Sequence, residues 1–260
     1  MYRLETKNYF ETLNGIAQKS SIRLDKYLKN PTEENVHDVR IAIRKMESAW
    51  IVLPKKIRQK GKVKRFIQTY KKFFKTNSEI RDFDIIQQRL GSIPLQTDQI
   101  KELIGQKKKR LMRAAKRQAR KSSKVKLPAI AGDDVTPAKL ERRFRKVTIG
   151  LIESMRALMQ TVLSSEERVA ELHKLRKDCK KLRYVMELSP TAESSGFVAK
   201  LKQMQEDLGL IHDIDITVVF LKKIASKHKI ANELVRLELE NRSRLYAKFV
   251  ETHGSEQKQD

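Results

Sequence analysis

The stretch Val36 to Glu47, VHDVRIAIRKME, recurs once, 136 residues later, as Leu172 to Arg183, LHKLRKDCKKLR. On a helical wheel each copy gathers its apolar residues on one side: Val36, Val39, Ile43, Met46 and Trp50 in the first copy, and Leu172, Leu175, Cys179, Leu182 and Met186 in the second. Beside each apolar side runs a stripe of one histidine and two cations at spacings of three and four: His37, Arg40 and Arg44, then His173, Arg176 and Lys180, with Lys45 and Lys181 at equivalent flanking positions. A solvated helix face usually mixes the signs of its charges, whereas this stripe repeats one sign in the same order twice. The repeat therefore predicts two helices that each present a core face and a cationic stripe.

The charge balance points to an anionic partner. The 260 residues include 57 lysines and arginines against 32 acidic residues, which leaves a formal net charge of +25. Such a charge exceeds what solubility requires and repels itself, so it is typical of proteins that bind nucleic acid, acidic lipid or another polyanion. A hydrophobic content of 39% still allows a packed core.

The single cysteine, Cys179, falls on the apolar stripe of the second copy, so we expect a buried structural thiol. No disulfide can form within the chain, which favours a reducing compartment. The N-terminal residues contain no apolar run of signal-peptide length, and no stretch approaches about 18 apolar residues. We therefore expect a soluble, cytoplasmic protein without a membrane partner; the sequence leaves its oligomeric state open.

Long stretches have a helical period and none alternates as a strand does, so the expected fold class is all-α. The expected helices cover residues 5–29, 32–53, 55–90, 97–121, 137–163, 164–188, 192–226 and 230–252. We expect breaks in the third region near Gly61 and Asn77 and in the seventh near Gly209, and a turn over residues 91–94. The sixth helix is expected to begin at a capping-box pattern of Ser164 and Glu167.

The order of these elements predicts an internal duplication. Residues 1–122 form the first half, 123–135 a linker without periodicity, 136–252 the second half, and 253–260 a disordered tail. A second pair of motifs supports the duplication, because IRDFD at 80–84 matches IHDID at 211–215 in the third helical region of each half. Helices with short connections pack antiparallel, so each half is predicted to be a four-helix bundle related to the other by an approximate two-fold axis.

Four motifs resemble the conserved histidine α-helical domain (CHAD) family. They are HxxRxxxRK at His37 to Lys45, RDFD at Arg81 to Asp84, HxxRxxxKKLRY at His173 to Tyr184, and LGLIHDID at Leu208 to Asp215, and the resemblance extends over about residues 5–252. It implies a pair of four-helix bundles around a basic central cavity that binds inorganic polyphosphate, and an association with polyphosphate granules in the cell. Glu47 departs from the family pattern, which often has a basic residue at this position.

The candidate polyphosphate-binding residues come from both motifs: His37, Arg40, Arg44, Lys45, His173, Arg176, Lys180, Lys181 and Arg183, with Arg81 and His212 as secondary candidates. Arginine presents a planar fork that suits phosphate oxygens, and lysine acts as a mobile point charge. Each of these side chains also has an ordinary interpretation, as a hydrogen-bonded group at a helix interface or a solvated charge.

Four aspartates, at positions 82, 84, 213 and 215, could suggest a metal-dependent phosphohydrolase. Aspartates two apart on a helix do not face each other, so we expect them to serve as caps or as partners that hold the motif cations. Glu238 and Glu240 echo the ExExK pattern of tunnel triphosphatases, but on a helix they diverge. We find no catalytic set, no metal site and no cofactor motif, and we expect a non-enzymatic protein.

Three functions stay open at this point. The first is binding of linear inorganic polyphosphate. The second is nucleic-acid binding, which is weakened by an aromatic content of 6% and by the lack of a helix-turn-helix signal. The third is a polyphosphatase or triphosphatase, which would need acidic metal ligands inside the basic site.

Overall fold

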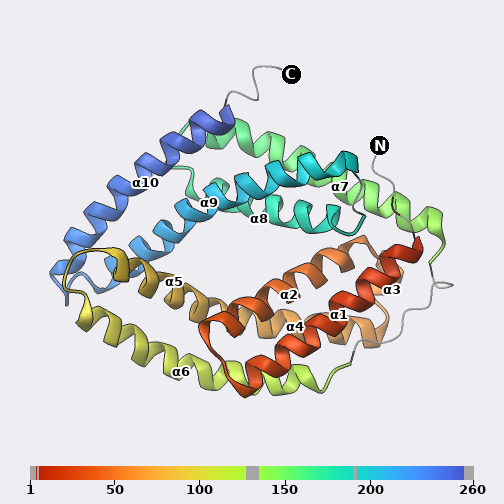
Figure 1. Cartoon of the computed structure of the whole chain (residues 1–260), viewed down its shortest axis with the longest axis horizontal. Helices are drawn as coiled ribbons and strands as arrows, with labels where there is room; N and C mark the ends of the chain where they lie inside the picture. The colour runs from red at the N-terminus through yellow and green to blue at the C-terminus, as the bar shows by residue number, and fades with distance from the viewer. Residues whose placement is uncertain (1–3, 5, 127–134, 190–191, 255–260) are drawn as a thin grey trace. The chain divides into compact units, whose positions relative to one another are not determined.

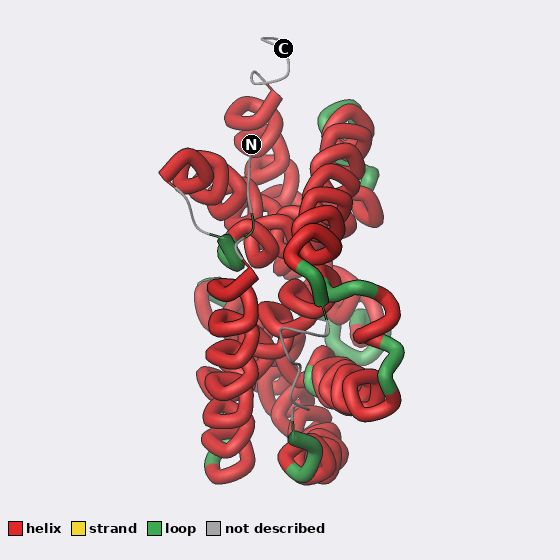
Figure 2. The backbone as a smooth tube through the Cα atoms, turned by 90° about the vertical axis from the view of Figure 1, so that its right-hand side faces the viewer, coloured by secondary structure: helices red, strands yellow, loops and turns green. Residues whose placement is uncertain are grey.

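The computed structural model describes residues 4, 6–126, 135–189 and 192–254. Within these residues the chain forms helices and no strand (Figure 2), which confirms the all-α class. The helices are α1 (Thr6–Lys29), α2 (Glu33–Val52), α3 (Lys55–Arg58), α4 (Gly61–Thr76), α5 (Ser78–Ser92), α6 (Asp98–Ser123), α7 (Pro137–Val162), α8 (Val169–Met186), α9 (Ala192–Ile224) and α10 (Ile230–Gly254), labelled in Figure 1.

Local rules explain where α2, the helix of the first motif, begins and ends. Thr32 is the N-cap, and its hydroxyl oxygen accepts a hydrogen bond from the Asn35 backbone N–H at 3.2 Å. Glu33 and Glu34 place negative charge in the first turn, where the helix dipole favours it. The helix ends at Val52, two residues before Pro54.

The predicted breaks in the third helical region are confirmed, because α3, α4 and α5 are separate helices. The second break is at Asn77, which is fully buried between α4 and α5. The Asn77 amide donates to the Phe73 carbonyl at 3.1 Å and accepts from the Tyr27 hydroxyl of α1 at 2.9 Å. A buried side-chain amide thus pairs with groups that the interrupted helix leaves at its end.

Three sequence predictions differ from the structure. The capping box at Ser164 is wrong: α8 begins only at Val169, and in the turn before it the Ser165 hydroxyl accepts from the Glu167 N–H at 3.2 Å. The break at Gly209 is also wrong, because α9 is continuous from Ala192 to Ile224. The predicted disordered tail begins too early, since α10 reaches Gly254 and His253 is buried, 2.9 Å from Asp207; residues 255–260 lie outside the described residues, as does most of the predicted linker.

The chain divides into two compact units, each made of three segments. The first contains Met1–Arg81, Lys107–Gly150 and Lys181–Val198; the second contains Asp82–Gln106, Leu151–Lys180 and Ala199–Asp260. Each unit takes residues from both halves of the predicted duplication, so the halves, their two-fold axis and a basic central cavity stay predictions.

In the first unit α1 and α2 lie side by side (Figure 1), and they are antiparallel because Tyr9, near the start of α1, donates to the Ala49 carbonyl near the end of α2 at 2.8 Å. In the second unit the rings of Phe83 on α5 and Phe220 on α9 meet edge to face at 5.7 Å. The apolar sides predicted for α2 and α8 are buried, including Cys179. Burial raises the pKa of Cys179 to about 12, which keeps the thiol protonated and fits a structural role.

None of the helices in the described part of the chain is both long and apolar enough to cross a membrane.

Candidate functional site

The cationic stripe of α2 is ordered by one aromatic ring. The guanidinium groups of Arg40 and Arg44 lie over the Phe74 ring of α4, with Cζ-to-centroid distances of 4.1 and 5.2 Å. Arg40 is only 9% exposed and also donates to the Phe74 carbonyl at 2.9 Å and to the Ser78 hydroxyl at 3.3 Å. The ring and the carbonyl therefore fix the two heads before any ligand arrives.

The ends of the two sequence motifs meet in the first unit, around Tyr184. Lys45 of α2 lies 2.9 Å from the Glu187 carboxylate, and Arg183 of α8 lies 3.7 Å from its other oxygen. Both cations also lie over the Tyr184 ring, at 5.5 Å for Lys45 Nζ and 4.6 Å for Arg183 Cζ. We call these four residues the Tyr184 cluster. It brings together one predicted ligand from each copy of the repeat.

Glu47, the departure from the family pattern, lies among cations of the first unit. Burial raises the pKa of the Glu47 carboxyl, and the positive charges of Lys71, Arg44 and Lys181 oppose that rise. These three side chains come from α4, α2 and α8, so three helices contribute charge around a single carboxyl. Glu47 is therefore a titrating group placed within the field of the predicted binding residues.

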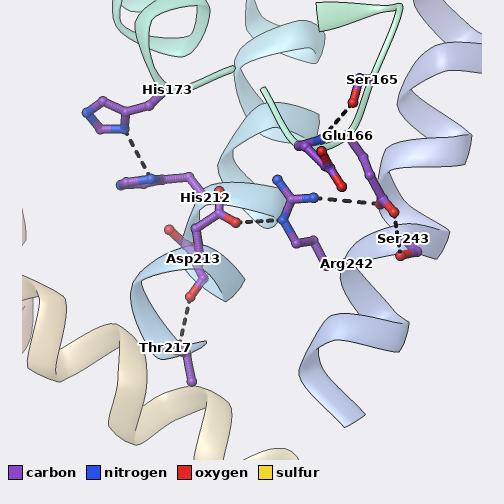
Figure 3. A network of polar contacts seen from close by, with 10 residues as sticks. Ser165, Glu166, His173, His212, Asp213, Thr217, Arg242 and Ser243 are labelled. Atoms are coloured by element: carbon purple, nitrogen blue, oxygen red, sulfur yellow. Dashed lines mark hydrogen bonds and ion pairs between the residues drawn. The ribbon is translucent and has the colours of Figure 1, made fainter. Parts of the chain in front are cut away.

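The second unit holds the other histidine and arginine of the second motif. The Nδ1 atoms of His173 on α8 and His212 on α9 are 3.1 Å apart, and Figure 3 shows the two rings directed at each other. Arg176, one turn after His173, lies 3.9 Å from Asp213 on α9. A hydrogen bond between two ring nitrogens needs one of them as acceptor, so the contact holds only while at least one imidazole is neutral. We call these four residues the histidine cluster.

The remaining predicted residues are placed differently. Arg81 pairs with Glu33 at the start of α2, at 2.9 Å. His37 and Lys181 are exposed on α2 and α8, and Lys180 is half-buried on α8.

The family is decided by a match to a known domain. A family model for the CHAD domain matches residues 21–222, most of the chain. The chain belongs to the CHAD family. The crystal structure of the CHAD domain from the plant Ricinus communis is similar to this CHAD domain with a TM-score of 0.64 and 14% sequence identity, over 95% of this chain and 87% of that one. At this identity the likeness extends to the fold alone. A search of curated proteins found no match.

The aspartates of this CHAD domain hold arginines rather than cap helices. Asp213 pairs with Arg176, and Asp215 accepts from the Arg242 Nε of α10 at 2.6 Å. Asp82 and Asp84 lie inside α5, several residues beyond the break at Asn77, so they are not caps at that break. Among the described residues, no group of three or more histidine, cysteine or acidic side chains is placed to hold a metal ion.

Glu238 is also a structural acid. It is 2% exposed, and it accepts from the Arg89 Nε of α5 at 3.1 Å. Glu240 instead pairs on the surface with Arg236 at 2.8 Å. The two carboxylates diverge, as the helical period predicts.

Sequence reasoning missed three contributors to the site: Phe74, Lys71 and Glu187. Glu187 lies four residues after Arg183, a spacing that predicts an ion pair on a helix. Lys71 and Phe74 carry no comparable signal, since Lys71 is one of many cations in α4 and Phe74 resembles any core aromatic. Only packing identifies them.

Gly209 supplies a prediction about the histidine cluster. A Cβ at this position would lie 3.7 Å from Arg176 Nε and 3.9 Å from a terminal guanidinium nitrogen, an ordinary contact distance. We expect Gly209→Ala to be tolerated, with a gain of about 0.5–1 kcal/mol in unfolding free energy because alanine is the better helix former. Gly209→Leu should displace the Arg176 guanidinium and weaken polyanion binding several-fold.

Thermal unfolding and a binding isotherm check both variants. Gly150 on α7 is the matched control, because a Cβ there meets nothing within 4 Å. Gly150→Leu should leave binding unchanged. Equal binding by the two leucine variants would show that the position of the Arg176 head does not matter.

Proposed function

We propose that this CHAD domain binds linear inorganic polyphosphate, without hydrolysing it, through the cations of its two motifs. The observation that supports this most is the Tyr184 cluster, where Lys45 of the first motif and Arg183 of the second share one carboxylate and one ring. Cations that are 8 residues apart from the start of each motif histidine, or further, thus act on the same small region of the first unit.

The ligand chemistry follows from how these cations are held. Polyphosphate carries a negative charge on every repeating unit, so it suits a row of fixed cations at helical spacing. Stacking on Phe74 and Tyr184 restrains the guanidinium heads, which lowers the entropy that binding costs. In the absence of ligand, Glu187 offsets the repulsion between Lys45 and Arg183. An incoming polyanion exchanges with this carboxylate.

The state of the aromatic rings favours a ligand without bases. Tyr184 is 6% exposed and cations lie over its ring, and two arginines lie over Phe74. Single-stranded nucleic-acid sites normally offer open aromatic faces on which bases stack. Neither ring is open in that way.

The histidine cluster is the second part of the proposal. Arg176 offers a guanidinium held beside Asp213, and the His173–His212 pair can take up a proton when negative charge approaches. We infer that each cluster contacts a polyphosphate segment, and each can be tested separately by substitution within its own unit.

Competition binding tests the proposal. Fluorescently labelled long-chain polyphosphate is bound at near-physiological salt and challenged with unlabelled polyphosphate, single-stranded DNA or RNA at equal phosphate concentration. We expect only polyphosphate to displace the label, and the chain length to stay unchanged after incubation with Mg²⁺. Equal displacement by RNA would favour the nucleic-acid function, and release of phosphate would favour the phosphatase.

Glu47 should make binding depend on pH. A bound polyanion raises the pKa of Glu47 beyond the rise that burial already causes, so binding takes up a proton. Affinity should therefore increase as the pH falls through the interval between the free and the bound pKa, and level off on either side. In Glu47→Gln this contribution disappears, and affinity at neutral pH should exceed that of the wild type.

Isotherms from about pH 5 to 8 at fixed ionic strength measure this effect. Histidines also titrate in that range, but they are common to both proteins, so the difference between the two profiles reports on Glu47. Parallel profiles would remove Glu47 from the binding region.

A further inference from the structure

One face of α6 carries a row of cations that the candidate site does not use. The sequence has no acidic residue between Glu102 and Asp133. Five cations of this segment follow one another along the helix and are exposed; we call them the α6 stripe: Arg110, Arg113, Arg117, Arg120 and Lys121. At about 100° per residue they fall within an arc of roughly 100°.

The opposite face of α6 packs inside the first unit, which fixes the direction of the stripe. Ala115, Ala119 and Ser122 are fully buried, and the Met112 sulfur accepts from the Tyr27 hydroxyl of α1 at 3.4 Å. The centre of the stripe lies roughly 180° around the helix from these residues. The five cations therefore point to solvent, away from the packed side of the helix.

The stripe differs from the other solvated faces of this protein. Exposed cations elsewhere have an acid four residues away on the same helix, as in Arg145–Glu141 on α7, Lys202–Glu206 on α9 and Arg236–Glu240 on α10. Within the part of the chain that the structure describes, no stripe residue forms an ion pair or a side-chain hydrogen bond. Like charges at spacings of three and four destabilise a helix, and an external anion would relieve that repulsion.

We propose that the α6 stripe binds the phosphate backbone of duplex DNA, without reading its sequence. Its five cations span 11 residues, about 16 Å, or about one cation per 4 Å. One strand of B-DNA has a phosphate about every 3.4 Å along the axis. A straight, rigid row of charge on one helix thus matches a straight, rigid row of phosphates, and four of the five residues are arginines, whose forks suit phosphate oxygens.

The surroundings of the stripe disfavour other anionic partners. A helix that lies on a membrane surface inserts exposed apolar residues, but the exposed large apolar residues are on other helices: Ile22, Ile149, Val169, Leu210, Val219 and Leu239. Single-stranded nucleic acid is bound by aromatic stacking, and Asp98–Ser123 contains no aromatic residue. Duplex DNA needs neither feature.

The salt dependence of binding tests this proposal. The probe is a labelled 24-base-pair duplex (about two helical turns), measured by fluorescence anisotropy between about 50 and 200 mM salt. Five phosphate contacts predict a slope of about −4.5 in log K against log salt concentration, a roughly 500-fold loss over this range. In the quadruple variant Arg110→Gln, Arg113→Gln, Arg117→Gln and Arg120→Gln the slope should fall to about −1. Glutamine is as good a helix former as arginine, and circular dichroism verifies that the helices persist.

A matched control removes four exposed lysines from the end of α9 and the segment after it, by glutamine substitution at Lys222, Lys223, Lys227 and Lys229. It carries the same net charge as the quadruple variant and should keep the wild-type slope. An equal loss in both variants would reduce the effect to net charge, and an unchanged slope in the quadruple variant would remove DNA from the stripe; either result overturns the proposal. So would a wild-type protein that does not bind the duplex.

Three further arms identify the partner. Duplex RNA should bind with a smaller loss in the quadruple variant than duplex DNA, because the match in charge spacing is to B-form geometry. Anionic vesicles should be bound equally weakly by the wild type and the quadruple variant, and polyphosphate equally tightly by both. If the quadruple variant loses vesicle or polyphosphate binding instead of DNA binding, the stripe belongs to that partner and the proposal is wrong. Failure of the DNA experiment leaves the polyphosphate proposal untouched, because no α6 residue enters it.

Discussion

Replacing Lys45 and Arg183 together by glutamine should weaken polyphosphate binding by about 100-fold or more. Each charge-assisted contact contributes about 1.5–3 kcal/mol, so two contacts correspond to about 3–6 kcal/mol. The lower end is expected, because Glu187 already occupies both cations and the ligand must exchange with it. Calorimetry or anisotropy with long-chain polyphosphate gives the affinity, and thermal unfolding shows that the variant is folded.

The control for this variant removes one lysine and one arginine that are likewise paired with glutamate, but on the open surface: Lys202→Gln with Arg236→Gln. Binding should then change only a few-fold, through the loss of net charge. The companion change Glu187→Gln should act in the opposite direction and tighten binding, since it releases Lys45 and Arg183. A folded Lys45/Arg183 variant that binds as well as the control would contradict the role of the Tyr184 cluster.

Arg242→Met should cause the largest loss of stability. Arg242 is 6% exposed on α10; its Nε donates to Asp215 on α9 at 2.6 Å, and a terminal nitrogen lies 3.6 Å from Glu166 (Figure 3). Removing one partner of a buried ion pair costs about 3–5 kcal/mol, because the other charge stays buried without compensation. For a chain of this size the midpoint of thermal unfolding should fall by roughly 10 °C.

The destabilisation by Arg242→Met should depend on pH with a definite sign. Burial already raises the pKa of Asp215 in the wild type, and the Arg242 hydrogen bond and charge oppose that rise. Without Arg242 the pKa rises further, so the folded variant binds a proton that the unfolded chain releases. Its stability then decreases as the pH rises from the ordinary carboxyl range through the raised pKa, and is nearly constant above it. The gap between wild type and variant should therefore narrow in acid.

Two further variants isolate the ion pair. Arg236→Met on the same helix breaks an exposed pair with Glu240 and should cost at most about 1 kcal/mol. Adding Asp215→Asn to Arg242→Met should recover part of the loss, since the uncompensated charge is then gone. An Arg242→Met protein as stable as Arg236→Met would show that the network does not hold α9 in place. That network matters for the site, because Asp215 lies three residues after His212 on the same helix.

The sequence alone determined the all-α class, most helix boundaries and which residues of each motif face the core. These features depend on interactions between residues close in the chain: the Thr32 cap, the breaks at Gly61 and Asn77, and the start of α7 at Pro137 all follow from local hydrogen bonding and backbone restraint. The repeated motifs also predicted membership of the CHAD family, which the family match confirmed.

Only the tertiary structure decided what each cation contacts. Phe74 lies 30 residues from Arg44 in the chain, yet its ring lies under that guanidinium, and Lys45 meets a glutamate from the far half of the sequence. Gly209, expected to break a helix, instead lies within one and leaves its surface open beside Arg176. Periodicity states which side of a helix a residue occupies, but the partner of a charge depends on which helix packs against that side, and long-range packing leaves no local pattern in the sequence.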